Sequence, residues 1–408
     1  MKRYESYKDS GVKWLGEIPS HWEVKRLGSY FTERRVKVSD EEYEPLSVTK
    51  LGVFPQWENV AKSNDGDNRK LVKKGDFVIN SRSDRKGSSG VSDRDGSVSL
   101  INIVLQPRKT IIAGYTNYLL KSYQFIEEYY RNGRGIVADL WTTRFDEMKM
   151  IKVAIPSIKE QEAIANYLDA ATSKIDEAIA QQQKMIDLLN ERKQIIINNA
   201  VTKGLDPNVK MKPSGIDWIG DIPEHWQLIP YRYLFYNLDY LRMPITADQR
   251  SRNNPQYDYY GASGVIDKID HYNVEDKVLL IGEDGANLLL RNLPLIYKAN
   301  GRFWVNNHAH ILKPIRDDYD YMAYVMEAAD YTLYITGSAQ PKLSQSNLNS
   351  VKLPIPPINE QKDIVDSLSR NTIGIDTALE IAIKQISLLQ ERKQIIINDV
   401  VTGKVKVV

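Results

Sequence analysis

The sequence contains no cysteine, which excludes disulfide bonds, thiolate nucleophiles and thiolate metal sites. It also lacks long apolar runs: stretches such as Ile195–Ile197 fall far below the roughly 18 residues needed to span a bilayer. Met1 to Ser6 are followed by no apolar stretch, so we predict no signal peptide. These absences favour a cytoplasmic protein that does not associate with a membrane.

Neither sign of charge dominates, since 55 Lys and Arg face 53 Asp and Glu in 408 residues. With 42% hydrophobic and 26% charged residues, the composition is that of a globular protein, and the length predicts about two to four domains. The charge is uneven: residues 1–155 carry 27 basic and 21 acidic side chains, whereas residues 205–355 carry 15 and 18. Any nucleic-acid binding would therefore use local patches, and the second half has the weaker electrostatic case.

The chain repeats itself. Residues 155–204 align without a gap on residues 355–404, with 25 identities in 50 positions. A second repeat pairs residues 10–22 with residues 214–226, at 8 identities in 13. The blocks between these anchors, 23–154 and 227–354, do not align convincingly. The order is therefore a short anchor, a divergent block and a repeated segment, twice over.

Each repeated 50-residue segment is typical of one long helix. It follows Pro156 or Pro356–Pro357, and residues 157–160 have the form of a capping box. Apolar residues recur every seven positions, which predicts a coiled-coil seam. The seam positions are Leu168, Ile175, Gln182, Leu189 and Ile196, and Leu368, Ile375, Ala382, Leu389 and Ile396. We expect Gly204 and Gly403 to end the helices and Gly374 to weaken the second.

The divergent blocks combine strand and turn signals. Residues 77–80, 97–105, 277–282 and 309–312 have strand character, and residues 87–96 and 300–301 are turn-rich. We predict an α+β protein with two mixed α/β-type domains, 1–155 and 205–355, and two helical spacers, 156–204 and 356–408. Equivalent helices that pack along their seams must run antiparallel, which predicts pseudo-two-fold symmetry and a C-terminus near the N-terminus. A helix of about 40 residues is about 60 Å long.

These motifs resemble the specificity subunit of type I restriction–modification systems over essentially the whole chain. The markers are the Trp-Leu-Gly-Glu-Ile-Pro-Ser-His-Trp anchor at 14–22 and its counterpart at 218–226, the Ile-Pro and Glu-Gln pairs at 155–161 and 355–361, and Glu-Arg-Lys-Gln-Ile-Ile at 191–196 and 391–396. The resemblance implies that the divergent blocks are target recognition domains that read the two halves of a split, asymmetric DNA site. It further implies that the helices set the spacer between the halves.

The resemblance also implies partners. Two methyltransferase subunits would bind the helices, and restriction or translocase subunits would join the full complex. The S-adenosylmethionine cofactor and the adenine methylation would belong to those partners, so we expect no catalytic residue, no metal and no cofactor in this chain. Double-stranded DNA would be its own ligand.

Candidate DNA contacts in the first block are basic and hydroxyl side chains beside the turn-rich segment, because such groups reach phosphates and guanine edges. The cluster at 69–74 fits phosphate positioning and an ordinary solvated surface equally well. The candidates are Arg69, Lys70, Lys73, Lys74, Ser81, Arg82, Ser83, Arg85, Lys86, Thr143 and Arg144.

In the second block, polar side chains lie in predicted turns. Carboxylates can accept from cytosine and an Asn amide can pair with adenine, so even an acidic domain could read bases. The candidates are Tyr257, Tyr259, Ser263, Asp284, Asn287, Arg302, Asn306, Asn307, Gln340 and Lys342. We interpret Trp304 and the anchor tryptophans (Trp14, Trp22, Trp218 and Trp226) as packing residues, and His308 and His310 as structural rather than metal-binding.

Two other functions fit parts of the sequence. Asn254–Tyr257 is an imperfect match to the motif of N6-adenine methyltransferases, but we find no convincing glycine-rich cofactor loop beside it, nor a phosphate-binding loop elsewhere. A coiled-coil scaffold without DNA specificity fits the composition equally well. A stand-alone enzyme would bind S-adenosylmethionine by itself, and a scaffold would show no salt-sensitive binding to duplex DNA.

Overall fold

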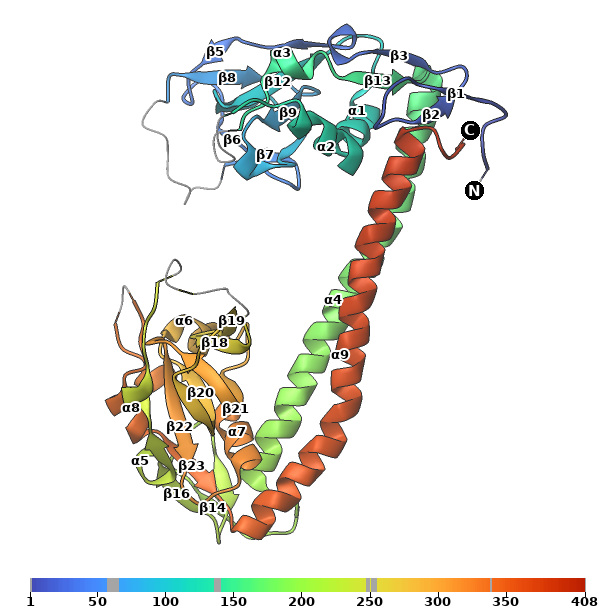
Figure 1. Cartoon of the computed structure of the whole chain (residues 1–408). Helices are drawn as coiled ribbons and strands as arrows, with labels where there is room; N and C mark the ends of the chain where they lie inside the picture. Colours follow the sequence, from blue (N-terminus) through green and yellow to red (C-terminus); the bar gives the residue numbers. More distant parts are fainter. Residues whose placement is uncertain are drawn as a thin grey trace. The chain divides into compact units, whose positions relative to one another are not determined.

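The computed structural model describes residues 2–56, 66–135, 141–246, 250, 255–337 and 340–407. Its contacts divide the chain into two units, one formed by residues 1–183 and 383–408 and the other by residues 184–382. Each unit holds one β-rich domain, the beginning of one long helix and the end of the other (Figure 1). The predicted α+β class, with two β-rich domains and two long helices that pack together, is confirmed.

The first domain is built around a four-stranded sheet of order β10-β9-β12-β4 and a three-stranded sheet of order β11-β8-β5. Its strands are β1 (Tyr7–Asp9), β2 (Glu17–Pro19), β3 (Glu23–Arg26), β4 (Phe31–Glu33), β5 (Lys37–Val38), β6 (Leu46–Val48), β7 (Val53–Pro55), β8 (Arg69–Val72), β9 (Phe77–Asn80), β10 (Ser89–Val91), β11 (Gly96–Ser99), β12 (Asn102–Pro107) and β13 (Lys152–Ile155). Its helices are η1 (Leu27–Ser29), η2 (Ser83–Arg85), α1 (Ala113–Lys121), α2 (Tyr123–Arg131) and α3 (Phe145–Met148).

Both faces of β9 are buried, which explains its unbroken apolar sequence. Phe77 and Ile79 pack into the core that also contains residues of α1 and α2, whereas Val78 packs into a second core with Val98 and Val104. The strand predicted at 97–105 proves to be two strands, β11 and β12, separated by a turn.

The second domain contains a six-stranded sheet of order β17-β22-β20-β21-β18-β19. Its strands are β14 (Met211–Pro213), β15 (Asp221–Pro223), β16 (Gln227–Pro230), β17 (Phe235–Asn237), β18 (Tyr257–Gly261), β19 (Gly264–Ile269), β20 (Val274–Gly282), β21 (Ile296–Val305), β22 (Ala309–Pro314) and β23 (Lys352–Ile355). Its helices are α5 (Tyr231–Leu234), η4 (Asp239–Leu241), α6 (Gly285–Leu290), α7 (Tyr319–Ala328), η5 (Thr332–Tyr334) and α8 (Gln345–Ser350). The strands predicted at 277–282 and 309–312 are confirmed within β20 and β22.

The long helices are α4 (Ile158–Lys203) and α9 (Ile358–Val401), and they pack antiparallel in each unit. In the first unit, Leu168 and Ile175 share a core with Ile396 and Val400. In the second unit, Leu368 shares a core with the last turns of α4. The predicted seam is therefore confirmed where it is buried, and each domain is packed against one helix from each repeat.

An ion pair links the helices in each unit, at positions related by the repeat. Lys393 Nζ lies 2.6 Å from Asp176 Oδ2 in the first unit, and Lys193 Nζ lies 2.5 Å from Asp376 Oδ1 in the second. Both pairs are partly exposed, so each contributes less than about 1 kcal/mol to stability. They instead help to fix which residues of the two helices lie opposite each other.

Glycines stop both helices as predicted. Gly204 has φ +73° and Gly403 has φ +77°, values that favour glycine because it has no Cβ. A Cβ at Gly403 would lie 2.4 Å from Pro19 Cδ, so space is restricted there too. The helix continues through Gly374, which has no neighbouring atoms within 4 Å of a built Cβ.

The repeated anchors bind the beginnings of the long helices. Glu160 Oε1 accepts hydrogen bonds from Trp22 Nε1 (3.1 Å) and the Tyr4 hydroxyl (2.6 Å), and Oε2 lies 3.0 Å from His21 Nε2. Burial and the bond to Glu160 raise the pKa of Tyr4 well above its usual value. The predicted capping box is thus half formed: Ser157 Oγ accepts from the Glu160 N–H (3.3 Å), but the Glu160 carboxylate serves the anchor instead.

The second unit repeats this arrangement. Trp226 Nε1 donates to Glu360 Oε1 (3.0 Å), and His225 Nε2 lies 2.8 Å from Glu360 Oε2. Trp22 and Trp226 are fully buried, which confirms their role as packing residues. In each unit, the His-Trp motif of the anchor therefore contacts the glutamate at the beginning of the long helix, although the two are far apart in the sequence.

Candidate nucleic-acid interface

The predicted contact segments of the first domain come together at the end of β9. Arg82 forms an isolated β-bridge with Thr142. The Thr143 N–H donates to the Ser81 carbonyl (3.0 Å), and the Ser83 N–H donates to the Trp141 carbonyl (3.1 Å). Segments 80–86 and 141–144, which are 60 residues apart in the sequence, therefore form one surface.

The second domain has the same arrangement at the end of β20. Asp284 forms an isolated β-bridge with Lys342. The Leu343 N–H donates to the Glu283 carbonyl (2.9 Å), and the Gly285 N–H donates to the Pro341 carbonyl (2.7 Å). Although the divergent blocks do not align by sequence, the backbone hydrogen bonds match pair for pair. The two domains thus present equivalent loops.

Four predicted contacts of the first domain are exposed on this surface. Arg82 and Arg144 project from the paired segments, Arg85 lies 3.6 Å from Asp84, and Lys86 lies 2.6 Å from Glu127. Ser83, which begins η2, is half-buried. The exposed ion pairs are weak, so phosphates could replace the carboxylates at little cost.

Three predicted contacts of the first domain are buried. The Arg69 guanidinium donates to Ser97 Oγ (2.8 Å) and to the Ser97 carbonyl (3.0 Å), and it is 6% exposed. Thr143 is fully buried, with Oγ1 donating to the Tyr129 carbonyl (3.1 Å), and Ser81 is 7% exposed. Because these side chains are enclosed, they do not enter the interface that we propose.

The other basic residues of the 69–74 cluster belong to β8 and the turn after it. Lys70 Nζ donates to the Asn102 carbonyl (2.7 Å), and Lys73 Nζ lies 2.8 Å from Asp95. Lys74 is exposed. Nothing brings this cluster to the paired segments, so its contact with phosphate stays a prediction.

Four predicted segments of the second domain converge. The turn at 261–264 packs on Gly282, where a Cβ would lie 2.6 Å from the Ala262 carbonyl oxygen. The Glu283 N–H donates to the His308 carbonyl (2.8 Å), which ties the β21–β22 turn to the same place. Together with the loop at 340–343, these turns carry the exposed or half-buried candidates Ser263, Asp284, Asn307, Gln340 and Lys342.

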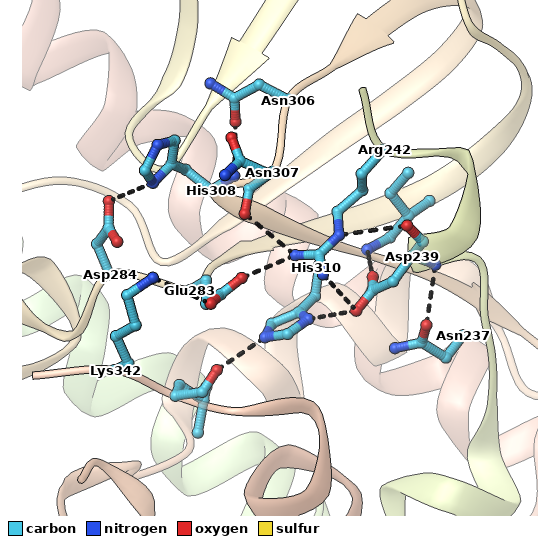
Figure 2. Close-up of polar contacts among 12 residues, drawn as sticks. Asn237, Asp239, Arg242, Glu283, Asp284, Asn306, Asn307, His308, His310 and Lys342 are labelled. Atoms are coloured by element: carbon cyan, nitrogen blue, oxygen red, sulfur yellow. Dashed lines mark hydrogen bonds and ion pairs between the residues drawn. The ribbon is translucent and has the colours of Figure 1, made fainter. Parts of the chain in front are cut away.

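An ion-pair network joins these turns (Figure 2). Glu283 lies between Arg242 Nη1 (2.8 Å) and Lys342 Nζ (3.2 Å). Burial opposes ionisation of Glu283, but the bonds from Arg242 and Lys342 outweigh it and hold the pKa of Glu283 below its usual value. His308 Nδ1 lies 3.1 Å from Asp284 Oδ2 on the neighbouring turn.

A buried histidine lies beneath the network. His310 is 1% exposed, with Nδ1 2.6 Å from Asp239 Oδ2 and Nε2 2.8 Å from the Leu343 carbonyl oxygen (Figure 2). Burial opposes ionisation of Asp239, but hydrogen bonds from His310 and the Ile311 N–H outweigh it and lower the pKa of Asp239. The structural interpretation of His310 is consistent with these contacts. In the ranges that the structure describes, no three His, Asp or Glu side chains are grouped to hold a metal ion.

Several predicted contacts lie elsewhere or face inward. Arg302 pairs with Glu275 (3.0 Å) and stacks on Tyr272, next to Tyr257. The Asn287 amide donates to the Leu293 and Pro294 carbonyls within its own loop. Tyr259 (1% exposed) and Asn306 (6%) are buried. Trp304 is buried as predicted, with Nε1 donating to the Met243 carbonyl (2.8 Å).

The sequence did not point to Asp239 or Arg242, whereas Glu283 lies in a turn predicted to carry polar readers. Asp239 is 71 positions from His310 and Arg242 is 41 positions from Glu283, and single charged residues in a strongly charged chain give no signal. Asn254, the first residue of the methyltransferase-like motif, lies outside the described residues, and Tyr257 of that motif begins β18. Within the described ranges, no helix is long and apolar enough to cross a membrane.

Comparison with known proteins gives a consistent result. A family profile described as "Type I restriction modification DNA specificity domain" matches residues 238–385. The type I restriction enzyme MjaVIII specificity subunit of Methanocaldococcus jannaschii is 24% identical over 98% of this chain and 97% of its own length. A second protein of that organism, named as an MjaX specificity subunit, is 23% identical over 98% of both chains.

The fold is also found in a solved structure, published as "Structural basis underlying complex assembly and conformational transition of the type I R-M system". One of its chains matches 95% of this chain and 99% of itself, with a TM-score of 0.66 and 12% identity. This match shows that the fold is shared. Over nearly its whole length, the chain is therefore similar to DNA specificity subunits of type I restriction–modification systems.

Proposed function

We propose that each β-rich domain reads one half of a split double-stranded DNA site in the cytoplasm, and that the helices fix the spacer and recruit two methyltransferase subunits. The matching loops at the ends of β9 and β20 carry this proposal. Exposed Arg82 and Arg144 would position phosphates or read guanines in the first domain. Asp284, Asn307 and Lys342 would read polar base edges in the second.

The different chemistry of the two loops supports two different half-sites. At equivalent bridge positions the first domain has Arg82 and Thr142, whereas the second has Asp284 and Lys342. A carboxylate favours the cytosine amino group and a guanidinium favours guanine, so one frame can read unlike sequences. A scaffold without DNA specificity gives no reason for such a pattern.

The long helices carry a second feature, outside the seam. Leu188 and Leu388 are 52% and 53% exposed, and Ile195 and Ile395 are 53% and 50% exposed. Folding does not require identical side chains at exposed positions of two repeats. Their identity supports two equivalent surfaces for two copies of one partner, to which restriction subunits would then add.

Methylation mapping tests the proposal. The chain is co-expressed with its methyltransferase subunit in a methylation-free host, and modified adenines are located across the genome. We expect one split motif with a fixed unspecified gap. Methylation in the absence of the methyltransferase subunit would show that this chain is itself an enzyme. If the intact complex methylates no DNA, the hypothesis of a scaffold without DNA specificity would be favoured.

The helix surfaces can be tested with matched variants. Leu388→Glu should lower the affinity of one methyltransferase subunit by about tenfold or more, because a charge replaces an exposed apolar contact. Ser387→Glu adds the same charge at the adjacent exposed position, which differs between the repeats, and should leave the affinity unchanged. Binding stoichiometry from light scattering would separate one lost site from two, and equal effects of both variants would contradict the proposed surface.

A further inference from the structure

In each domain, a buried side chain makes a hydrogen bond to one backbone carbonyl of the loop that pairs with the central strand. In the first domain, the Tyr129 hydroxyl donates to the Thr143 carbonyl (2.9 Å). In the second domain, His310 Nε2 lies 2.8 Å from the carbonyl of Leu343, the equivalent residue. Both carbonyls belong to the loop that pairs with the end of the central strand, so each side chain fixes the loop that we assign to DNA reading.

The two side chains differ in the number of acceptors that they face. The imidazole of His310 faces an acceptor at both nitrogens, the Asp239 carboxylate at Nδ1 and the Leu343 carbonyl at Nε2. A carbonyl oxygen can only accept, and an ionised carboxylate can only accept. The ring therefore lies between two acceptors and links the Asp239 carboxylate to the loop. The phenol of Tyr129 donates one hydrogen bond and carries no charge.

We propose that His310, held by Asp239, is a positioning residue that fixes the Lys342 loop for reading the second half-site. The inference rests on the proposed DNA-reading function of that loop. Without the imidazole, the Leu343 carbonyl would lose its partner Nε2. The loop would lose its attachment, while the Tyr129 attachment in the first domain would stay.

Other charged groups surround this pair, and none of them replaces it. The Arg242 Nη2 atom lies 3.6 Å from Asp239 Oδ2, and Arg242 also pairs with Glu283. Glu283 in turn pairs with Lys342 on the loop itself. These side chains are partly exposed, whereas His310 and Asp239 are 1% and 8% exposed. The buried pair therefore holds the backbone, and the outer network orients the Lys342 side chain.

The test uses the complex of the full chain with its methyltransferase subunits. Methylation rates are measured on duplexes with one changed base in either half-site, and the specificity ratio is taken for each half separately. His310→Gln should lower discrimination at one half-site by about tenfold, because one amide cannot bond both acceptors. Tyr129→Phe should do the same at the other half-site only.

Asp239→Asn provides a conservative variant with a distinct expectation. Its amide oxygen can still accept from the Ile311 N–H, and its NH2 can donate to Nδ1 of a neutral ring, which leaves the Nε2 proton on the Leu343 carbonyl. Discrimination should therefore be retained.

Each outcome decides between the two hypotheses. A wild-type complex that recognises no split site would overturn the proposed function, and this inference with it. A split site that His310→Gln leaves unchanged, or relaxes equally in both halves, would overturn the inference alone. If His310→Gln does not fold in thermal unfolding, a comparison of Asp239→Ala with Asp239→Asn decides, because only the amide keeps a partner for His310 Nδ1: equal discrimination at the second half-site in both variants would refute the role of His310.

Discussion

Removal of the anchor carboxylates should destabilise the two units by different amounts. Glu160 accepts hydrogen bonds from the half-buried Tyr4 hydroxyl and the buried Trp22 indole, whereas among the described residues Glu360 accepts one such bond, from Trp226. A hydrogen bond to a charged acceptor is worth about 1.5–3 kcal/mol, so Glu160→Ala should cost about 3–6 kcal/mol and Glu360→Ala about half of that. The histidine partners are about half exposed and add little.

The assay is urea unfolding of the full chain, followed by circular dichroism. Glu162→Ala is the matched control, since Glu162 is an exposed glutamate in the same helix turn and should change the free energy of unfolding by less than about 0.5 kcal/mol. If Glu360→Ala costs as much as Glu160→Ala, the half-buried Tyr4 bond contributes nothing and the reasoning is refuted.

Three further outcomes are expected in the same assay. Leu368→Ala should cost about 2–5 kcal/mol because Leu368 is 1% exposed in the helix seam, and a loss under about 1 kcal/mol would contradict tight packing there. Lys193→Ala should cost less than about 1 kcal/mol, because its ion pair with Asp376 is partly exposed, and a larger loss would mean that the pair is more than a register mark. Burial raises the pKa of Glu327 despite hydrogen bonds from the Ile296 and Leu295 N–H groups, so the wild type should lose stability relative to Glu327→Gln as the pH rises through that pKa. The difference in free energy of unfolding between the two proteins should therefore be larger at about pH 8 than at about pH 5. An equal difference at both pH values would contradict the burial of a charge at Glu327.

The sequence predicted what depends on periodicity and repetition. The seven-residue pattern located both long helices. The recurrence of the His-Trp and Glu-Gln motifs in both halves of the sequence indicated that these motifs matter for the fold. It could not show that Glu160 binds Trp22, because the contact joins positions 138 residues apart. The capping-box interpretation predicted that the Glu160 carboxylate bonds the backbone of its own helix. In the structure it instead accepts a hydrogen bond from Trp22 of the anchor.

For the interface, the sequence located the loops better than the side chains. Segments 80–86, 141–144, 283–284 and 340–342 do come together in pairs within each domain. Burial could not be read from residue type: Arg69 was expected at the surface, yet its guanidinium bonds Ser97 inside the domain. The pairing of His310 with Asp239 depends on strand register, which a single sequence does not specify.

The crossed arrangement of the long helices has a consequence for synthesis on the ribosome. The first unit is completed by residues 383–408, whose Ile396, Val400 and Val401 fill the core around its own domain. The domain made first is therefore the last to receive its full core, and it waits for the whole of the second domain to be translated. A chain that stops shortly before residue 383 would keep the second unit whole and leave the N-terminal domain unfinished, so premature termination would damage the end of the protein that was made first.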